Sequence, residues 1–334
     1  MNITWKKAVK AVGGAATVIT AASLTAYCTS KYLMKIAMDR EPPKAPKGVD
    51  KLIAGMIPSR DFLDTMEKTA IRLSQQENET VTIRAQDGTL LVGHWIPCDN
   101  PKRIMIAMHG WRSTWYRDFG MIADFWRSNG CSVLYAEQRG QGASGGDYMG
   151  FGLTERFDCL DWIHWINDRL GTALPIYLCG VSMGATTVLM AAGLDLPENV
   201  HGIGADCGFT SPDAIWQHVS SDNLHIPFGV YRRLANEICE QKIHFTASDY
   251  STVEALKKTK VPVLFVHGTD DTFVPVEMTF ENYKACAGPK KLLVVPGADH
   301  GMSYYVDRAN YEAATLDFWK EYDNVSFADI KEGE

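Results

Sequence analysis

The chain has 334 residues, of which 46% are hydrophobic and 22% charged, and its formal net charge at pH 7 is -7. A chain of this length and composition can bury one large α/β core or two modest ones. The aromatic content of 10% argues against a disordered protein, and the negative net charge argues against nucleic acid as a partner.

Residues 1–48 differ in character from the rest of the chain. An uncharged run over residues 11–30 lies between Lys10 and Lys31, and its length matches the roughly 20 residues that cross a bilayer. We therefore expect a signal-anchor that holds the protein at a membrane, followed by a Pro-rich tether at residues 40–48, with the domain outside the cytoplasm. A cleaved signal peptide and an amphipathic helix packed on the domain are the two alternatives.

The eight cysteines do not have the spacing of a metal or redox site. The sequence contains no C-x-x-C and no H-E-x-x-H motif, and its nine histidines are scattered. Cys131, Cys179 and Cys207 fall inside or beside apolar runs, where a free cysteine behaves as a small hydrophobic residue. We therefore expect mostly free thiols and no bound metal.

Residues 49–334 predict one α/β domain, which begins with a helix within residues 50–76. A hairpin is predicted over residues 80–85 and 90–96, because Asp87 and Gly88 between them form a strong turn signal. Six further apolar runs predict buried strands, at 103–109, 131–137, 175–180, 201–207, 261–268 and 291–297. Helical periodicity separates most of these runs, at 118–128, 154–169, 183–193, 249–259, 277–287 and 304–320.

This order of elements indicates the architecture of the domain. Continuous apolar strands that alternate with amphipathic helices are typical of a mostly parallel sheet with helices on both faces. With the two strands of the hairpin, the predicted sheet has eight strands. Residues 211–248 interrupt the alternation, and we expect them to form a small helical cap.

Residues 175–193, PIYLCGVSMGATTVLMAAG, place one serine at a sharp strand-to-helix turn. Ser182 lies between Gly180 and Gly184, which is the pattern of a nucleophile elbow. The N-terminus of the following helix offers unpaired N–H groups where negative charge would develop. Because a single G-x-S-x-G also occurs by chance as an ordinary turn, the interpretation depends on whether catalytic partners follow.

The partners that an elbow requires follow in the expected chain order of serine, acid and histidine. The predicted strand at 261–268 ends in a glycine turn, directly before Asp270 and Asp271. His300 comes after the predicted strand at 291–297 and a Pro-Gly turn. The spacing alone does not decide which of the two aspartates is the catalytic acid.

Five motifs together resemble the α/β-hydrolase superfamily, and most of all a bacterial group of serine aminopeptidase-like and dienelactone hydrolase-related esterases with a short N-terminal hydrophobic segment. These motifs are MHGW (108–111), EQRGQGASGG (137–146), GVSMGA (180–185), HGTDDTFVP (267–275) and ADHGMS (298–303). The resemblance covers residues 80–320 and implies the α/β-hydrolase fold. One departure is Glu137, where the family pattern has an aspartate.

The resemblance also implies roles for individual residues. The family pattern H-G-x-x-D-x-x-V-P selects Asp271 as the acid, four residues after His267. It assigns the oxyanion-binding N–H groups to Trp111, which follows the first His-Gly pair, and to Met183, which follows the nucleophile. These roles are expectations that the structure can test for geometry.

The chemistry of these groups predicts a serine hydrolase without a cofactor. A serine hydroxyl is a weak nucleophile at neutral pH, so His300 would accept the proton of Ser182, and Asp271 would orient the imidazole. We expect the enzyme to cleave small-molecule carboxylic esters or thioesters through an acyl-enzyme. A serine aminopeptidase, or a non-catalytic membrane-tethered binding protein on a hydrolase fold, is the alternative.

Aromatic residues in the cap and the loops are candidates for an apolar substrate pocket. The predicted pocket residues are Trp115, Tyr116, Phe209, Trp216, Phe228 and Tyr304. Each of them has an alternative role, which is to pack the cap onto the sheet. Acidic cap residues are candidates for holding the free amine of a peptide: Asp213, Asp222, Glu237 and Glu240.

Overall fold

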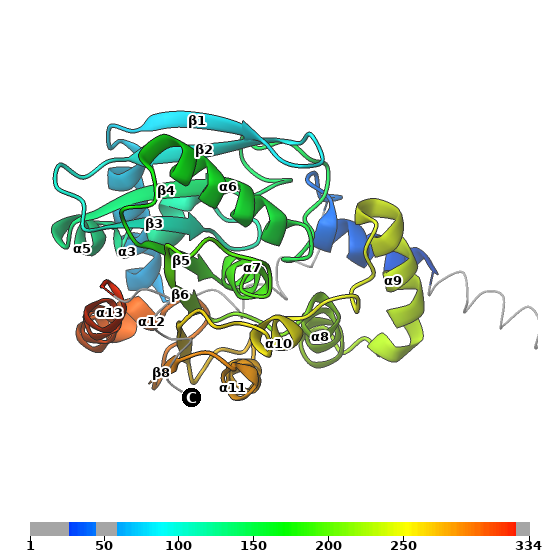
Figure 1. The fold of residues 1–334 in the computed structure, drawn as a ribbon. Helices are drawn as coiled ribbons and strands as arrows, with labels where there is room; N and C mark the ends of the chain where they lie inside the picture. Colours follow the sequence, from blue (N-terminus) through cyan, green and yellow to red (C-terminus); the bar gives the residue numbers. More distant parts are fainter. Residues whose placement is uncertain (1–26, 45–58, 325–334) are drawn as a thin grey trace, which may run out of the picture.

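The computed structural model describes residues 27–44 and 59–324, and within them eight strands form one sheet (Figure 1). The strands are β1 (Glu79–Arg84), β2 (Leu90–Ile96), β3 (Arg103–Met108), β4 (Cys131–Glu137), β5 (Ile176–Val181), β6 (Val200–Asp206), β7 (Val263–Gly268) and β8 (Lys290–Val295). Their spatial order is β1-β2-β4-β3-β5-β6-β7-β8. The hairpin β1–β2 and the pair β2–β4 are antiparallel, and all other pairs are parallel.

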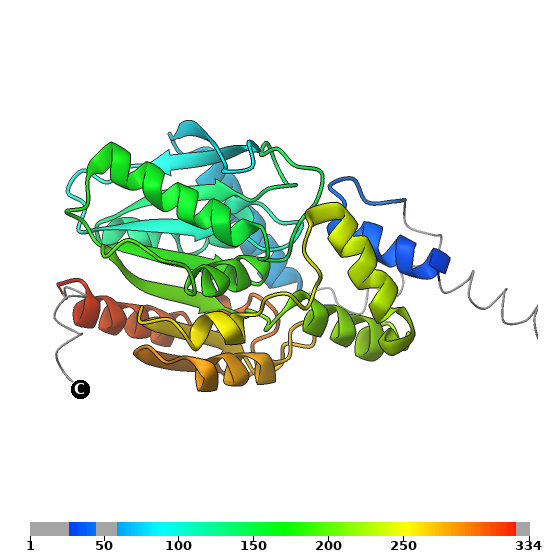
Figure 2. The same ribbon diagram turned by 45° about the vertical axis from the view of Figure 1, so that its right-hand side comes forward.

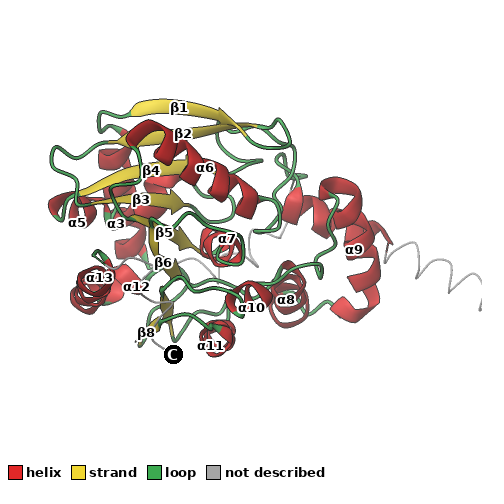
Figure 3. Ribbon diagram, viewed as in Figure 1, coloured by secondary structure: helices red, strands yellow, loops and turns green. Residues whose placement is uncertain are grey.

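Helices cover both faces of this sheet, because its central strands are apolar on both sides (Figure 3). One layer consists of α6 (Glu155–Leu170), α7 (Met183–Ala191), α10 (Thr252–Leu256) and α11 (Val276–Ala285). The opposite layer consists of α3 (Arg60–Ser74), α4 (Trp115–Phe119), α5 (Ala123–Ser128), α12 (Ser303–Val306) and α13 (Arg308–Tyr322). This arrangement confirms the predicted α/β-hydrolase fold with a mostly parallel eight-stranded sheet.

Two helices that the sequence predicts as continuous are broken in the structure. The predicted helix at 118–128 is divided into α4 and α5 near Gly120, where a side chain would collide with the main chain of α3. The predicted helix at 304–320 is divided at Asp307, whose side chain accepts the N–H of Asn310 and caps α13. The first break reflects a contact with a distant segment and the second a local cap, and hydrophobic periodicity reports neither of them.

The cap is helical, as predicted for residues 211–248. It consists of α8 (Pro212–His218), a π-helical turn (Val219–Asn223) and α9 (Phe228–Ile243). Ser211 caps α8 by accepting the N–H of Ala214. The chain leaves α9 through His244, which has a left-handed backbone conformation. This turn directs the chain back toward the sheet.

A helix over residues 27–38 lies beside α9 in both ribbon views (Figures 1 and 2). Its Met34 and Met38 are buried in the apolar cluster that also contains Trp216 and Phe228 of the cap. Asp39 at its end forms an ion pair with Lys242 of α9, with 2.6 Å between the charged atoms. These contacts hold the helix over residues 27–38 against the cap.

The remaining parts of the predicted anchor and tether, residues 1–26 and 45–48, lie outside the described residues. Among the helices within 27–44 and 59–324, none combines the length and the apolar character that a bilayer crossing requires. All eight cysteines are free thiols, and five of them are buried. The predicted unpaired state of the cysteines is therefore confirmed.

Candidate active site

The predicted nucleophile elbow is present at the junction of β5 and α7. Ser182 has a left-handed φ of 55° with ψ at -118°, and its N–H donates to the carbonyl of Asp206 at 2.9 Å. A side chain at Gly180 would overlap the backbone of Gly184, and one at Gly184 would overlap the carbonyl of Met108. The two glycines of the motif are therefore required by the close packing around this strained turn.

Ser182, His300 and Asp271 form a continuous hydrogen-bonded chain. The Nδ1 atom of His300 lies 2.7 Å from Oδ2 of Asp271, and Nε2 of the same ring lies 2.9 Å from Oγ of Ser182. A carboxylate only accepts hydrogen bonds, so Nδ1 carries the proton and Nε2 is free to accept the serine proton. The three side chains come from the ends of β5, β7 and β8, and parallel strands bring these ends to one edge of the sheet.

The carboxylate in this hydrogen-bonded chain belongs to Asp271, and not to its neighbour Asp270. The Asp271 carboxylate is buried and accepts the N–H groups of Phe273 and Val274 at 2.9 and 2.8 Å. Asp270 is exposed, and among the described residues its carboxylate accepts only a local hydrogen bond from the Thr269 hydroxyl. Spacing along the sequence could not separate the two aspartates, but the burial of one of them does.

Electrostatics keep Asp271 ionised. Burial by itself would raise the pKa of Asp271, but the nearby His300 and hydrogen bonds from His267, His300 and Val274 together lower it below its ordinary value. The Nε2 atom of His267 faces Oδ2 of Asp271 at 3.1 Å, and its Nδ1 atom lies 2.6 Å from the Thr279 hydroxyl. His267 is thus a second histidine that holds the acid in place.

The imidazole of His300 is stabilised in its charged form. Burial by itself would lower the pKa of His300, but the sulfur of Cys207 and the carboxylate of Asp271 raise it above its ordinary value. The ring of Phe273 packs edge-on against the imidazole, with 5.1 Å between the centroids. An imidazole that becomes charged when it takes a proton is therefore supported on the side away from Ser182.

Two backbone N–H groups next to Ser182 are available to bind an oxyanion. Met183 is the first residue of α7, and Trp111 follows the β3 loop glycine, Gly110. Among the hydrogen bonds of the described residues, neither the Met183 nor the Trp111 N–H has an acceptor. The Asp118 carboxylate accepts the N–H of Gly110 at 2.6 Å and so fixes the loop. The catalytic role of both N–H groups stays a prediction.

The loop after β3 that contains Gly110, Trp111 and Arg112, called the oxyanion loop below, also contacts the N-terminal segment. The indole N–H of Trp111 donates to the carbonyl of Ala37 at 2.8 Å. Arg112, in a left-handed conformation with φ of 50°, donates through its guanidinium to the carbonyls of Ile36, Asp39 and Arg40. These carbonyls are at the C-terminal end of the helix over residues 27–38, where helical carbonyls need external donors. The N-terminal segment and the oxyanion loop therefore complete each other.

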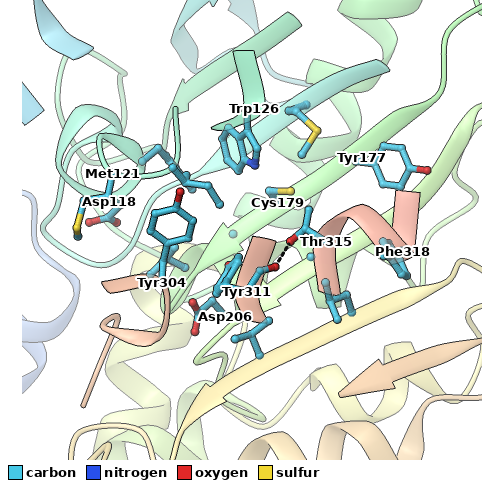
Figure 4. Close-up of a pocket in the computed structure, with 18 of the residues that line it drawn as sticks. Asp118, Met121, Trp126, Tyr177, Cys179, Asp206, Tyr304, Tyr311, Thr315 and Phe318 are labelled. Atoms are coloured by element: carbon cyan, nitrogen blue, oxygen red, sulfur yellow. Dashed lines mark hydrogen bonds between the residues drawn. The ribbon is translucent and has the colours of Figure 1, made fainter. Parts of the chain in front are cut away.

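The six predicted pocket residues lie in three different environments. Trp115 is a core residue that stacks on His94, and Tyr116 packs edge-on against Trp115. Three cap-side residues are buried in the apolar cluster under the cap: Phe209, Trp216 and Phe228. Tyr304 lines a cavity on the α13 face of the sheet (Figure 4). A role in substrate binding stays a prediction for all six.

Three residues at the site carry structural roles that the sequence reading did not assign. His267 and Asp118 support the acid and the oxyanion loop, as described above. Asp206 is buried at the end of β6, where its carboxylate accepts the hydroxyl of Ser303 at 3.0 Å. The spacing of four residues between His267 and Asp271 was a usable signal, but nothing local marks Asp118 or Asp206.

Among the described residues, one group of donors has metal-ligand spacing. The ligand atoms of Cys207, Asp271 and His300 lie within 4.8 Å of one another. Both nitrogen atoms of His300 are already hydrogen-bonded, to Asp271 and to Ser182. A metal ion at this position would therefore replace the contacts of the hydrogen-bonded chain.

Comparisons with known proteins agree with this architecture. The uncharacterised protein YqkD of Bacillus subtilis is 27% identical over 245 residues, which are 73% of this chain and 80% of the relative. An esterase of Pyrococcus furiosus has a TM-score of 0.59 at 22% identity, over 74% of this chain and 92% of its own. Est1E of Butyrivibrio proteoclasticus, solved with ferulic acid, has a TM-score of 0.55 at 21% identity, over 72% of this chain and 98% of its own. At these identities the structural likeness shows the fold.

The family comparison covers the elbow, the acid and the histidine together. The model of the prolyl oligopeptidase family matches residues 117–325, which is more than half of the chain. The matched region begins in α4 and runs through the last described helix, α13. The chain therefore belongs to the prolyl oligopeptidase family, on the α/β-hydrolase fold.

Proposed function

We propose that the protein is a serine hydrolase that cleaves carboxylic esters, or thioesters, through an acyl-enzyme on Ser182. The observation that carries the proposal is the hydrogen-bonded chain from Ser182 through His300 to Asp271, next to two backbone N–H groups without acceptors. Ser182 is the nucleophile, His300 the general base and acid, and Asp271 the group that orients the ring.

The reaction uses these groups in two half-reactions. In the first, Oγ of Ser182 attacks the ester carbonyl carbon while its proton moves to Nε2 of His300, and the tetrahedral oxyanion forms. The bond to the leaving oxygen then breaks, and His300 returns the proton to that oxygen. In the second half-reaction a water molecule repeats the attack with the same proton transfers, and the carboxylic acid is released.

The oxyanion is the point at which the fold contributes most. The N–H groups of Trp111 and Met183 would donate to it, and a single donor of this kind contributes about 3–4 kcal/mol to transition-state stabilisation. Met183 begins a helix, so the partial positive charge of the helix N-terminus adds to the same attraction. The left-handed turn at Ser182 aims the hydroxyl outward from this position.

Ester cleavage is better supported than aminopeptidase activity by the state of the acidic cap residues. An aminopeptidase needs a free carboxylate for the peptide amine, but Asp213 is paired with Arg232 at 2.8 Å and Glu237 with Arg233 at 3.0 Å. The Pyrococcus furiosus neighbour named above is an esterase, although the family name of the matched region refers to a peptidase. Two of the four candidate carboxylates are therefore already paired with arginines, and this supports an ester over a peptide as the substrate.

A panel of p-nitrophenyl esters, thioesters and amino-acid anilides tests this proposal, together with a fluorophosphonate probe that labels activated serines. We expect ester cleavage to be the fastest reaction, and Ser182→Ala to lower kcat by about 10⁴-fold or more and to abolish labelling. The control variant is Ser128→Ala, an exposed serine in α5, which should keep both. Full turnover by folded Ser182→Ala protein would rule out the nucleophile, and faster anilide cleavage would favour a peptidase.

A further inference from the structure

The two central strands β5 and β6 are covered on both faces, yet three residues in the row that faces α13 are only partly buried. Cys179 and Val181 of β5, and Gly204 of β6, all point to the α13 face and retain solvent-accessible surface. Their neighbours that point to the α7 face are fully buried. In a close-packed sheet both rows would be equally buried, so the α13 side contains unfilled space.

This space is a cavity between the sheet and the helices α4, α12 and α13 (Figure 4). The space inside it that the centre of a water-sized sphere can reach is about 60 Å³. Asp118, Met121 and Tyr304 lie at one end, and Tyr177 and Phe318 lie at the other end, with Cys179 between them. A side chain at Gly204 would meet only the sulfur of Cys179, at 3.4 Å, because the glycine faces the open space.

One end of the cavity adjoins the catalytic residues. Val181 directly precedes Ser182, and Gly301 directly follows His300, and both residues line the cavity. Asp118, which also lines it, holds the N–H of Gly110 in the oxyanion loop. The cavity follows β5 from Val181 to Tyr177, which at about 3.3 Å per residue is a length of about 13 Å.

The walls of the cavity define the kind of group that fits. Most of the lining side chains are apolar or aromatic, and the deep end is formed by Tyr177, Phe318 and Trp319. Two carboxylates, of Asp118 and Asp206, lie closer to the catalytic end. Burial of an apolar chain in this cavity would be favourable, whereas a negatively charged group on the ligand would be repelled by both aspartates.

We propose that this cavity is the acyl-binding site, and that it takes an extended, uncharged acyl group of medium chain length. The inference rests on the proposed function, because it assumes an acyl group attached to Ser182. It places the acyl group in the cavity between the sheet and α13, and not among the aromatic residues of the cap. The leaving alcohol then faces the cap and the solvent.

The substitution Gly204→Val tests the inference, because valine suits a strand and its methyl groups would enter the cavity beside Cys179. The measurement is kcat/KM for p-nitrophenyl acetate and octanoate, in the full chain. We expect the variant to lose about tenfold or more on octanoate and less than about twofold on acetate, since a pocket methylene contributes 10-fold or more to discrimination. Gly204→Ala, with a smaller side chain, should give an intermediate loss on octanoate.

The matched control is Trp216→Leu, which enlarges the space under the cap and leaves the cavity unchanged. It should keep the ratio of octanoate to acetate turnover at the wild-type value. The rate of fluorophosphonate labelling of Ser182 shows whether each variant is folded with a working triad. An unchanged ratio in both Gly204 variants, with a changed ratio in Trp216→Leu, would place the acyl group under the cap and overturn the inference.

The failure of the inference differs from the failure of the proposed function. If wild-type protein cleaves both esters and labels normally, but the Gly204 variants have the wild-type chain-length profile, then only the acyl site is wrong. If wild-type protein cleaves no ester and is not labelled, then the proposed function fails, and the acyl site fails with it.

Discussion

Ser182, Asp271 and His300 lie at one edge of the sheet, between the cap on one side and α13 on the other. These two sides differ in how completely they are packed. On the cap side, Met34 and Met38 of the N-terminal helix are buried together with Trp216 in one apolar cluster. On the α13 side, Cys179 and Gly204 face a cavity although they lie in central strands. The comparison indicates that one side holds the catalytic loops in place, while the other side leaves room for a ligand.

The filled side is held by directional contacts as well as by apolar packing. Arg112 and Trp111 donate to main-chain carbonyls of residues 36–40, and Lys242 of α9 is paired with Asp39. Hydrogen bonds from a charged donor to buried acceptors contribute more than neutral ones, about 1.5–3 kcal/mol each. A segment far from the triad in the sequence is therefore part of the support of the oxyanion loop.

Removal of residues 1–44 would delete the contacts that support the cap side. Among changes outside Ser182, His300 and Asp271, we expect this one to have the largest effect on kcat. The truncation deletes the carbonyl groups that the Trp111 indole and the Arg112 guanidinium contact. The backbone N–H of Trp111, which is the predicted oxyanion donor, is then no longer held in place. Because a single oxyanion donor contributes roughly 100-fold to 1,000-fold to kcat, kcat for a short ester should fall by about 100-fold. Removal of residues 1–26 alone, which deletes none of these carbonyls, should leave kcat within about twofold. Equal kcat for the two truncated proteins would contradict the comparison.

The substitution Arg112→Ala sharpens the comparison at one residue, with a smaller expected effect. The guanidinium supports three carbonyls, and its loss should lower kcat by about tenfold with little change in KM, because the oxyanion exists only in the transition state. Arg112→Lys, which keeps the charge but not the forked geometry, should recover part of kcat. The control is Arg233→Ala, whose guanidinium is exposed on α9 and pairs only with Glu237 within the described residues. A lower melting temperature of Arg112→Ala at unchanged kcat would show a purely structural role.

The cavity side carries a charge whose protonation affects stability. Burial raises the pKa of Asp206 to about 6; His267, the Ser303 hydroxyl and His300 lower it in part, and Asp271 raises it. An unfolded aspartate has a pKa near 3.9, so the folded value is the higher one. Asp206 therefore contributes stability that is fully present below about pH 4 and is lost as the pH rises through about 6.

Asp206→Asn tests this charge and has the smallest expected effect. Asparagine is always neutral and can still accept the hydrogen bond from Ser303. The melting temperature of the variant should exceed that of the wild type by roughly 2–4 °C at pH 8, and the difference should vanish near pH 4. The measurement is a thermal melt at both values of pH. A difference that does not depend on pH would show that the Asp206 carboxylate is not the titrating group.

The elements that the sequence predicted correctly are those whose evidence is local. Each buried strand is a continuous apolar run, and the elbow is marked by Gly180 and Gly184, which the structure shows to be sterically required. The order of Ser182, Asp271 and His300 followed from the elbow, and the structure places the three within hydrogen-bonding distance. Local patterns suffice here because strand burial and tight turns depend on neighbouring residues.

The elements that the sequence did not predict depend on contacts between distant segments. The sequence did not predict the helix over residues 27–38, and nothing in its composition shows that Arg112 would donate to the carbonyls at its end. The break of the predicted helix at 118–128 depends on the approach of α3 to Gly120. Asp118 looks like an ordinary helix aspartate in the sequence, and Asp206 ends a predicted buried strand. Only their positions next to Gly110 and Ser303 reveal their roles.

The amino-acid sequence by itself determined the α/β class, the eight strands, the elbow and the chain order of the predicted serine, acid and histidine. Only the tertiary structure showed that Asp271 is buried against His300 while Asp270 is exposed, where residues 27–44 pack, and that a cavity lies between the sheet and α13. The physical reason is that hydrophobic periodicity and turn residues act over a few positions, whereas burial, ion pairing and empty space depend on how remote elements meet.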